Sequence, residues 1–174
     1  MLWLTLVATI SGAAPLPPIV ADFQSVCGAQ NQSRDGILAE AKREGWTARP
    51  SAPADDGQTQ RLIHAGADRL GLAVTTTHSA GEVRQACGLT SATAVPGIAA
   101  AAQSALGFKP AVDLGSAATF FAVRTGNRWR SATELTSAER AAAKTAGRLY
   151  TIVASSTGTS ASIYTLHVTA STRP

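Results

Sequence analysis

Residues 70–91 read LGLAVTTTHSAGEVRQACGLTS, and we expect two strands joined by a tight turn there. In the first half, leucines and a valine alternate with smaller residues, which is the pattern of a strand with one buried side. The SAGE sequence at 79–82 suits a hairpin turn. In the returning strand Val83, Cys87 and Leu89 share one face. Cys87 is therefore expected to point into the core.

The rest of the chain alternates short helices with further strands. Helices are expected where apolar residues recur at helical spacing between cap residues, such as Ser33 before and Gly45 after one segment. Pro96 is expected in the first turn of another helix. The expected helices are 17–26, 33–44, 96–106 and 137–146. The further expected strands are 59–64, 117–124, 128–132, 148–155 and 161–170.

These elements together predict an α+β fold with one domain over residues 14–174. Strands joined by tight turns are antiparallel, and the alternation means that each strand buries one side. Helices must cover that side, which gives a two-layer sandwich: a meandering antiparallel sheet with helices packed on one face. The length of 174 residues fits a single domain.

Composition favours a folded chain with a core of small aliphatic side chains. Hydrophobic residues make up 45% of the chain, aromatic residues 5% and charged residues 15%, so bulk disorder is not expected. No apolar run reaches about 18 residues, and a conventional membrane-spanning helix is therefore not expected. The net charge of +4 at pH 7 favours anionic partners.

Residues 1–13 have the pattern of a secretory signal peptide. A short apolar run at Leu2–Ile10 is followed by small residues up to Ala14. Cleavage is expected after Ala13, which would leave a periplasmic or secreted mature chain. The usual basic start of a signal is missing, and the alternative is the buried first helix of a cytosolic domain. The three prolines within 15–18 argue against such a helix because proline breaks helical continuation.

Cys27 and Cys87 are the two cysteines of the chain, and in an exported protein they predict one disulfide. Closing a loop of about 60 residues would raise the free energy of unfolding by at most about 4 kcal/mol on the chain-entropy account. A pair of buried thiols and a metal pair remain as alternatives. A zinc site is disfavoured because neither cysteine has a histidine near it in the sequence.

Sequence motifs of common enzymes are missing from the chain. It lacks GxSxG, the phosphate loop GxxxxGK[ST], GxGxxG and HExxH. Asp55-Asp56 lies in a proline-rich loop, where a solvated turn is expected rather than a metal site. His64, His78 and His167 are isolated in the sequence. His78 is expected to be exposed, and His167 is expected to face solvent from the threonine-rich side of the last strand. No catalytic residue, metal or cofactor is predicted.

The segment from Arg124 to Arg130 is the one suggestive surface. With a hairpin turn at 126–127, Arg124 lies opposite Trp129, so its guanidinium can stack on the indole. Arg128 and Arg130 then project from the other face. Three arginines and a tryptophan on one hairpin predict a weak anion-binding site formed by these four residues. An ordinary edge strand that its charge protects from aggregation is the other interpretation, and the sequence favours it over an anion site.

The predicted compartment narrows the partners of this hairpin. Nucleic acid is not expected outside the cytoplasm. The candidates are anionic envelope components, such as lipid headgroups or polyanionic sugars, and another envelope protein.

Four short features carry a resemblance to known proteins. They are the apolar segment Leu2–Ala14, the pair Phe23 and Cys27, the dipeptide Gly45-Trp46, and the dipeptide Cys87-Gly88. In these features the chain resembles a loose group of small exported bacterial proteins of unknown function. The resemblance implies export and a disulfide, and it implies no activity. The function expected from the sequence is a non-enzymatic binding or structural module. The alternative is a small exported hydrolase, which would need a histidine beside a carboxylate in a pocket.

Overall fold

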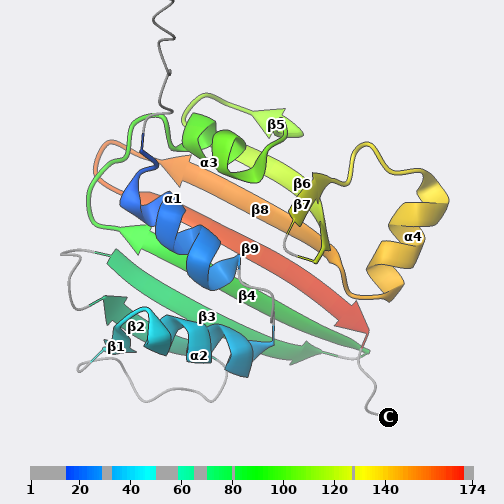
Figure 1. Cartoon of the computed structure of the whole chain (residues 1–174), viewed down its shortest axis with the longest axis horizontal. Coiled ribbons are helices and arrows are strands. Elements are labelled where there is room, and N and C mark those ends of the chain that lie inside the picture. Colours follow the sequence, from blue (N-terminus) through cyan, green and yellow to red (C-terminus); the bar gives the residue numbers. More distant parts are fainter. Residues whose placement is uncertain are drawn as a thin grey trace, which may run out of the picture.

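A computed structural model describes residues 15–28, 33–49, 59–64, 70–79, 81–126 and 128–170. Within these ranges one broad antiparallel sheet is combined with short helices (Figure 1), and the predicted α+β class is confirmed. The strands are β1 (Trp46–Ala48), β2 (Thr59–His64), β3 (Leu70–Ser79), β4 (Glu82–Ser91), β5 (Val112–Asp113), β6 (Ala117–Thr125), β7 (Arg128–Ser131), β8 (Leu149–Ser156) and β9 (Ala161–Ala170). The helices are α1 (Pro18–Asp22), the π-helical turn η1 (Phe23–Cys27), α2 (Arg34–Arg43), α3 (Ile98–Leu106) and α4 (Ser137–Thr145). The predicted signal segment 1–13 and Asp55-Asp56 lie outside the described residues.

The strands follow the order β1-β2-β3-β4-β9-β8-β6-β5, and β7 also pairs with β6. Every pairing is antiparallel. From β1 to β4 neighbours in the sheet are neighbours in the chain, as a meander requires. The last strand, β9, then lies between β4 and β8 and joins the two halves of the chain into one sheet. β4 and β9 are ten residues long and pair along their whole length.

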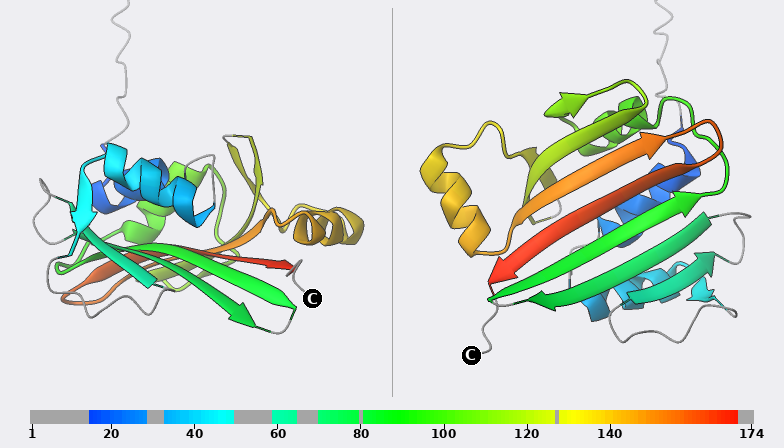
Figure 2. Two further views of the ribbon diagram at one scale, coloured as in Figure 1. Left: turned by 90° about the horizontal axis from the view of Figure 1, so that it is seen from below. Right: turned by 180° about the vertical axis from the view of Figure 1, so that it is seen from behind.

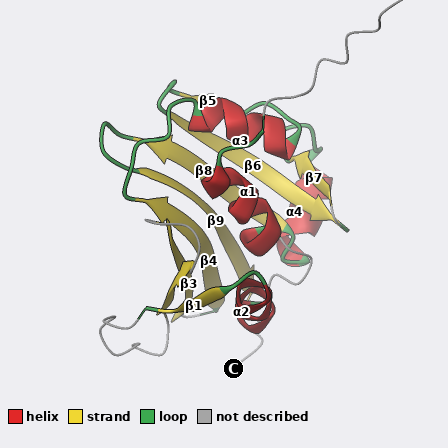
Figure 3. Cartoon of the chain, turned by 60° about the vertical axis from the view of Figure 1, so that its left-hand side comes forward, coloured by secondary structure: helices red, strands yellow, loops and turns green. Residues whose placement is uncertain are grey.

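Helices α1, α2 and α3 lie on one face of the sheet, which we call the inner face (Figures 2 and 3). The opposite, outer face carries no helix in the view from behind (Figure 2), and α4 lies beyond the ends of β6 and β8 (Figure 1). Because alternate side chains of a strand point to opposite faces, each strand contributes about half of its side chains to the inner face and half to the outer face. On the outer face Phe121, Tyr164 and Leu166 stay 43%, 39% and 37% exposed.

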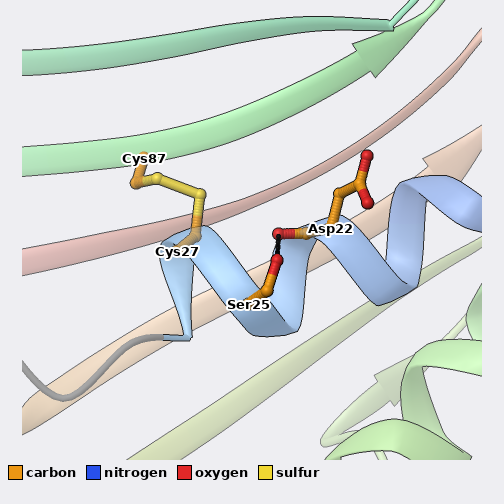
Figure 4. Close-up of a disulfide and its surroundings, with 4 residues drawn as sticks. All are labelled: Asp22, Ser25, Cys27 and Cys87. Atoms are coloured by element: carbon orange, nitrogen blue, oxygen red, sulfur yellow. Dashed lines mark hydrogen bonds between the residues drawn. A yellow bond between two sulfur atoms is a disulfide. The ribbon is translucent and has the colours of Figure 1, made fainter. Parts of the chain in front are cut away.

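The core lies between the inner face and the helices and is built mainly from aliphatic side chains. Phe23 from η1 and Phe120 from β6 are the largest side chains that are fully buried. A disulfide joins Cys27, at the end of η1, to Cys87, in the middle of β4, with 5.5 Å between the Cα atoms (Figure 4). The predicted disulfide is therefore confirmed. It fastens the N-terminal helix to the centre of the sheet.

The N-terminal helix widens just before this disulfide. In η1 the amide of Gly28 donates to the carbonyl oxygen of Phe23 at 2.8 Å, which is the spacing of a π-helical turn. A Cβ atom at Gly28 would lie 2.4 Å from the carbonyl oxygen of Gln24, so glycine is required directly after Cys27. The Gln24 side-chain amide donates to the carbonyl oxygen of Ala105 at 2.7 Å and links η1 to α3.

The prediction that Pro96 lies in the first turn of a helix is wrong. The Val95 carbonyl oxygen accepts a hydrogen bond from the Ile98 amide at 3.2 Å, which closes a turn with Pro96 and Gly97 at its centre. Gly97 has φ +74°, as the third residue of a type II turn requires. The chain is therefore still turning at Pro96, and α3 begins two residues later at Ile98.

The prediction that His167 faces solvent is also wrong, because His167 lies half-buried on the inner face. In the register of β4 with β9, Cys87 is opposite Thr165. Since the disulfide holds Cys87 inward, residues of the same parity on β9 point inward too, and Ile163 and Thr165 are buried. Tyr164, which the sequence would place inside by its hydrophobicity, lies on the outer face instead.

Candidate anion-binding site

The β6–β7 hairpin brings together the first two residues of the candidate site. Arg124 pairs with Trp129 across the hairpin, as the predicted turn requires. Gly126 has φ +58°, which suits the first central residue of a type I′ turn. Asn127, the other expected turn residue, lies outside the described residues. The guanidinium carbon of Arg124 is 4.8 Å from the centre of the Trp129 ring, a cation–π distance.

Arg124 is an unusual residue because it is charged, 92% buried and incompletely hydrogen-bonded. Its exposed fraction is 8%, although arginine is almost never fully buried without a partner. Nε donates to the carbonyl oxygen of Gly126 at 3.0 Å. Nη1 is also buried, and among the described residues it has no hydrogen-bond partner. A buried donor of this kind carries the full penalty of its lost hydration.

The contact with Trp129 continues across the inner face through two further rings. Trp129 meets Tyr150 of β8 edge to face, with 5.1 Å between ring centres. Tyr150 stacks on His167 of β9 at 4.7 Å. The imidazole Nε2 lies 2.5 Å from the carbonyl oxygen of Gly147, and because a carbonyl can only accept, Nε2 carries the proton. We call Arg124, Trp129, Tyr150 and His167 the arginine–aromatic stack.

Burial shifts the pKa values of Arg124, Tyr150 and His167 in the arginine–aromatic stack. Loss of hydration lowers the pKa of Arg124, and the neighbouring Tyr150 partly opposes this shift. Loss of hydration also raises the pKa of Tyr150, and Arg124 opposes it. For His167 burial lowers the pKa, while the hydrogen bond to Gly147 raises it by less. Each shift reflects the same cause, since burial penalises the charged form of every group.

Arg124 also lines a small pocket of about 200 Å³ between the β6–β7 hairpin and α4. Two exposed arginines, Arg130 of β7 and Arg148 before β8, line the same pocket, together with Glu139 of α4. The backbones of Arg124 and Arg148 lie side by side, because the Arg124 amide donates to the carbonyl oxygen of Arg148 at 3.3 Å. We call this the arginine pocket. Three arginines against one glutamate leave it with an excess of positive charge.

Glu139 is already engaged in capping α4. Its carboxylate accepts hydrogen bonds from the amide of Thr136 at 2.8 Å and from the Thr136 hydroxyl at 2.7 Å. The Thr136 hydroxyl in turn accepts from the Glu139 amide, which completes a capping box. The hydrogen bonds from Thr136, aided by the charge of Arg130, lower the pKa of Glu139. The carboxylate is thus held by the helix start and offsets only part of the arginine charge.

The structure divides the four predicted site residues between two pockets. Arg124 and Arg130 line the arginine pocket. Arg128 and Trp129 line a different pocket of about 390 Å³, beside Gln24. The hairpin is therefore not a single surface of three equivalent arginines.

Sequence reasoning missed three residues around the site: Arg148, Tyr150 and His167. The register of β8 with β9 pairs Ser156 with Ala161, and this pairing places Tyr150 opposite His167. The sequence placed Tyr150 in one strand and His167 in the next but gave no register between these strands, so it could not place the two rings opposite each other. Arg148 could be recognised only as a cation following a helix.

The other two histidines, His64 and His78, do not line the arginine pocket. His64 Nε2 lies 2.8 Å from the carbonyl oxygen of Glu44, and its ring meets the buried Trp46 edge to face at 5.3 Å. His78 is exposed, as predicted. Within the described part of the chain, no group of three or more histidine, cysteine or acidic residues could hold a metal ion. No helix in that part is long and apolar enough to cross a membrane.

Comparison of the chain with protein-family models, with curated proteins and with solved structures found no match.

Proposed function

We propose that this chain is an exported, disulfide-stabilised binding module without enzymatic activity, and that it recognises an anionic group in the arginine pocket. The signal-like residues 1–13 and the Cys27–Cys87 bond support export. The ligand is a phosphate, sulfate or carboxylate group carried by an envelope component such as a lipid headgroup or an acidic sugar, or by another envelope protein.

The observation that carries this proposal is the cluster of three arginines at one pocket, whose single carboxylate, that of Glu139, already caps α4. A buried guanidinium without a carboxylate is unfavourable, and replacing it by an apolar residue would usually stabilise a fold. An oxyanion in the arginine pocket would be held by the exposed guanidiniums of Arg130 and Arg148, and the buried charge of Arg124 would add to the positive field at the pocket. A pocket of about 200 Å³ has room for such a group.

The test is calorimetric titration of the purified chain with inorganic phosphate and with sulfate. Arg130→Gln and Arg148→Gln should each weaken binding about tenfold, because each removes one charge-assisted hydrogen bond. Arg128→Gln is the matched control: it removes the same charge from the same hairpin but from the other pocket, and should leave binding unchanged. Equal weakening by all three variants would mean attraction to the overall positive charge, and the arginine pocket would be rejected.

A second variant separates binding from folding. Arg124→Met keeps a long side chain over Trp129 but removes the buried charge, so we expect phosphate binding to weaken, with the melting temperature equal or higher. A lower melting temperature with phosphate binding retained would make Arg124 a structural residue.

The source of the anion is distinguished with vesicles. Retention on phosphatidylglycerol vesicles, absent on phosphatidylcholine vesicles and competed by inorganic phosphate, would identify a lipid headgroup. Binding of free phosphate without retention on vesicles would point to a soluble ligand. In both cases binding should weaken with salt, since the arginines at the pocket's entrance are exposed.

A further inference from the structure

A larger pocket of about 510 Å³ lies on the outer side of the sheet, where β6 and β8 meet the segments on either side of α4. Phe121 and Thr151 come from the outer face of these strands, and Leu149 begins β8. Ala132 and Thr133 follow β7 and close one side. We call this the outer pocket. Its volume lies within the roughly 300–1,000 Å³ typical of small-molecule sites.

The outer pocket is apolar but has a single charge. Four of the seven described residues that line it are hydrophobic and two are threonines. Arg140 is the one charged residue among them. One of its nitrogens, Nη2, donates to the carbonyl oxygen of Leu135 at 3.1 Å, which tethers the side chain. A guanidinium has five N–H donors, so the tethered group keeps donors for a ligand. The pocket thus pairs an apolar wall with one held cation.

The apolar surface of the outer pocket continues along the open face of the sheet. Phe121 is directly opposite Thr151, and Thr151 is directly opposite Leu166 on β9. Side chains in such pairs are about 5 Å apart on the same face. Phe121 and Leu166 are 43% and 37% exposed. An elongated apolar ligand leaving the pocket would therefore meet further apolar side chains rather than charged ones.

We propose that the outer pocket binds an aliphatic carboxylate, with its tail against Phe121 and Leu149 and its carboxylate on Arg140. Charge selects the ligand class: Arg140 favours an anionic head and repels a cationic one. The apolar lining excludes a small hydrophilic anion, which the arginine pocket would take instead. This site uses none of the four residues that define the arginine pocket, so an experiment can reject one proposal without rejecting the other.

The experiment compares two amphiphiles with unbranched tails of nearly equal length, below their micelle concentrations. Calorimetry of the full chain with decanoate should show saturable binding of one molecule per chain. Decyltrimethylammonium should bind at least ten times more weakly. Equal binding of the two would mean adsorption by the tail alone, and no binding of decanoate would mean that the pocket is not a site; both results would overturn the proposal.

Variants then place the ligand. Arg140→Gln should weaken decanoate binding about tenfold and leave the weak binding of the cationic amphiphile unchanged or slightly tighter. Phe121→Thr, which replaces the ring by a small side chain of high strand propensity, should weaken both ligands. Arg61→Gln, at an exposed arginine of β2, is the control for net charge and should change neither.

Arg130→Gln distinguishes the two pockets. It should leave decanoate binding unchanged while it weakens phosphate binding. Loss of decanoate binding in Arg130→Gln or in Arg61→Gln would contradict the assignment to the outer pocket. Unchanged melting temperatures of the four variants show that a loss of binding does not reflect unfolding, and Arg140→Lys, which restores a cation, should recover part of the affinity.

Discussion

We expect the half-buried His167 to make the stability of the fold depend on pH between its lowered pKa and the ordinary value. Because burial lowers the pKa of His167 below its ordinary value of 6.5, the unfolded chain takes up a proton at a higher pH than the folded chain does. Well above pH 6.5 the imidazole is neutral in both the folded and the unfolded chain, so the histidine contributes no pH dependence there. Between that value and the lowered pKa, unfolding is accompanied by proton uptake, so the free energy of unfolding falls as the pH falls.

Urea unfolding at pH 7.5 and at pH 5.5 checks this expectation. The wild-type chain should lose stability at the lower pH, and His167→Phe, which keeps a ring on Tyr150, should lose less. His78→Gln, at an exposed position, should lose as much as the wild type. A histidine-independent loss, equal in His167→Phe and the wild type, would show that the buried imidazole is not its cause.

At the scale of one element, the end of α4 decides the position of Arg148. Gly147 donates to the carbonyl oxygen of Lys144 at 3.0 Å, and Arg148 donates to that of Ala143 at 2.8 Å. This pair of bonds is a Schellman motif, which ends the helix and turns the chain into β8. Gly147 has φ +60°, and a Cβ atom there would lie 2.6 Å from Cγ2 of Thr169.

Gly147→Ala should therefore lower the free energy of unfolding by on the order of 2 kcal/mol, because it combines a strained φ with a clash against a strand. Gly107→Ala is the matched control. Gly107 also follows a helix with positive φ, +81°, but has nothing within 4 Å of a Cβ atom. It should show only the conformational part, about 1 kcal/mol. Equal losses in thermal or urea unfolding would rule out the predicted clash.

Local signals predicted most elements because each depends on neighbours in the sequence. The Ser33 hydroxyl caps α2 by accepting a hydrogen bond from the Gly36 amide at 3.1 Å, and Gly45 follows the helix with φ +87°, both as expected. The dipeptide Pro96-Gly97 was ambiguous, since proline suits both a first helical turn and a type II turn. Only the positive φ of Gly97 separates the two.

The site could be predicted only in part, because most of it depends on contacts between distant segments. Arg124 and Trp129 were recognisable, since one hairpin contains both. Tyr150 and His167 join them only through the β8–β9 register, and the burial of Arg124 depends on how the layers pack. The place of β9 beside β4 also has no local signal, because this pairing joins residues 70 or more positions apart.

At the scale of the whole molecule, the disulfide should supply a large part of the stability. Replacing both cysteines by alanine should lower the free energy of unfolding by up to about 4 kcal/mol, since the unfolded chain regains the freedom of a loop closed over 60 residues. Thermal unfolding measures the loss. A reducing agent should lower the melting temperature of the wild type and leave the double variant unchanged. Alkylation of two cysteines in unfolded, unreduced protein would contradict the bond.

The same bond gives the chain the mechanical form of a ring with a tail. The ring runs from Cys27 to Cys87 and includes α2 and β1–β3, whereas β5–β9 belong to the tail. When the two ends are pulled apart, only residues outside the ring can lengthen the chain. Roughly 200 Å of extended chain, about 60 residues, stays hidden until the bond is reduced. Force applied at the end of β9 therefore acts on its pairing with β4, which belongs partly to the ring, and on its pairing with β8, which lies outside it.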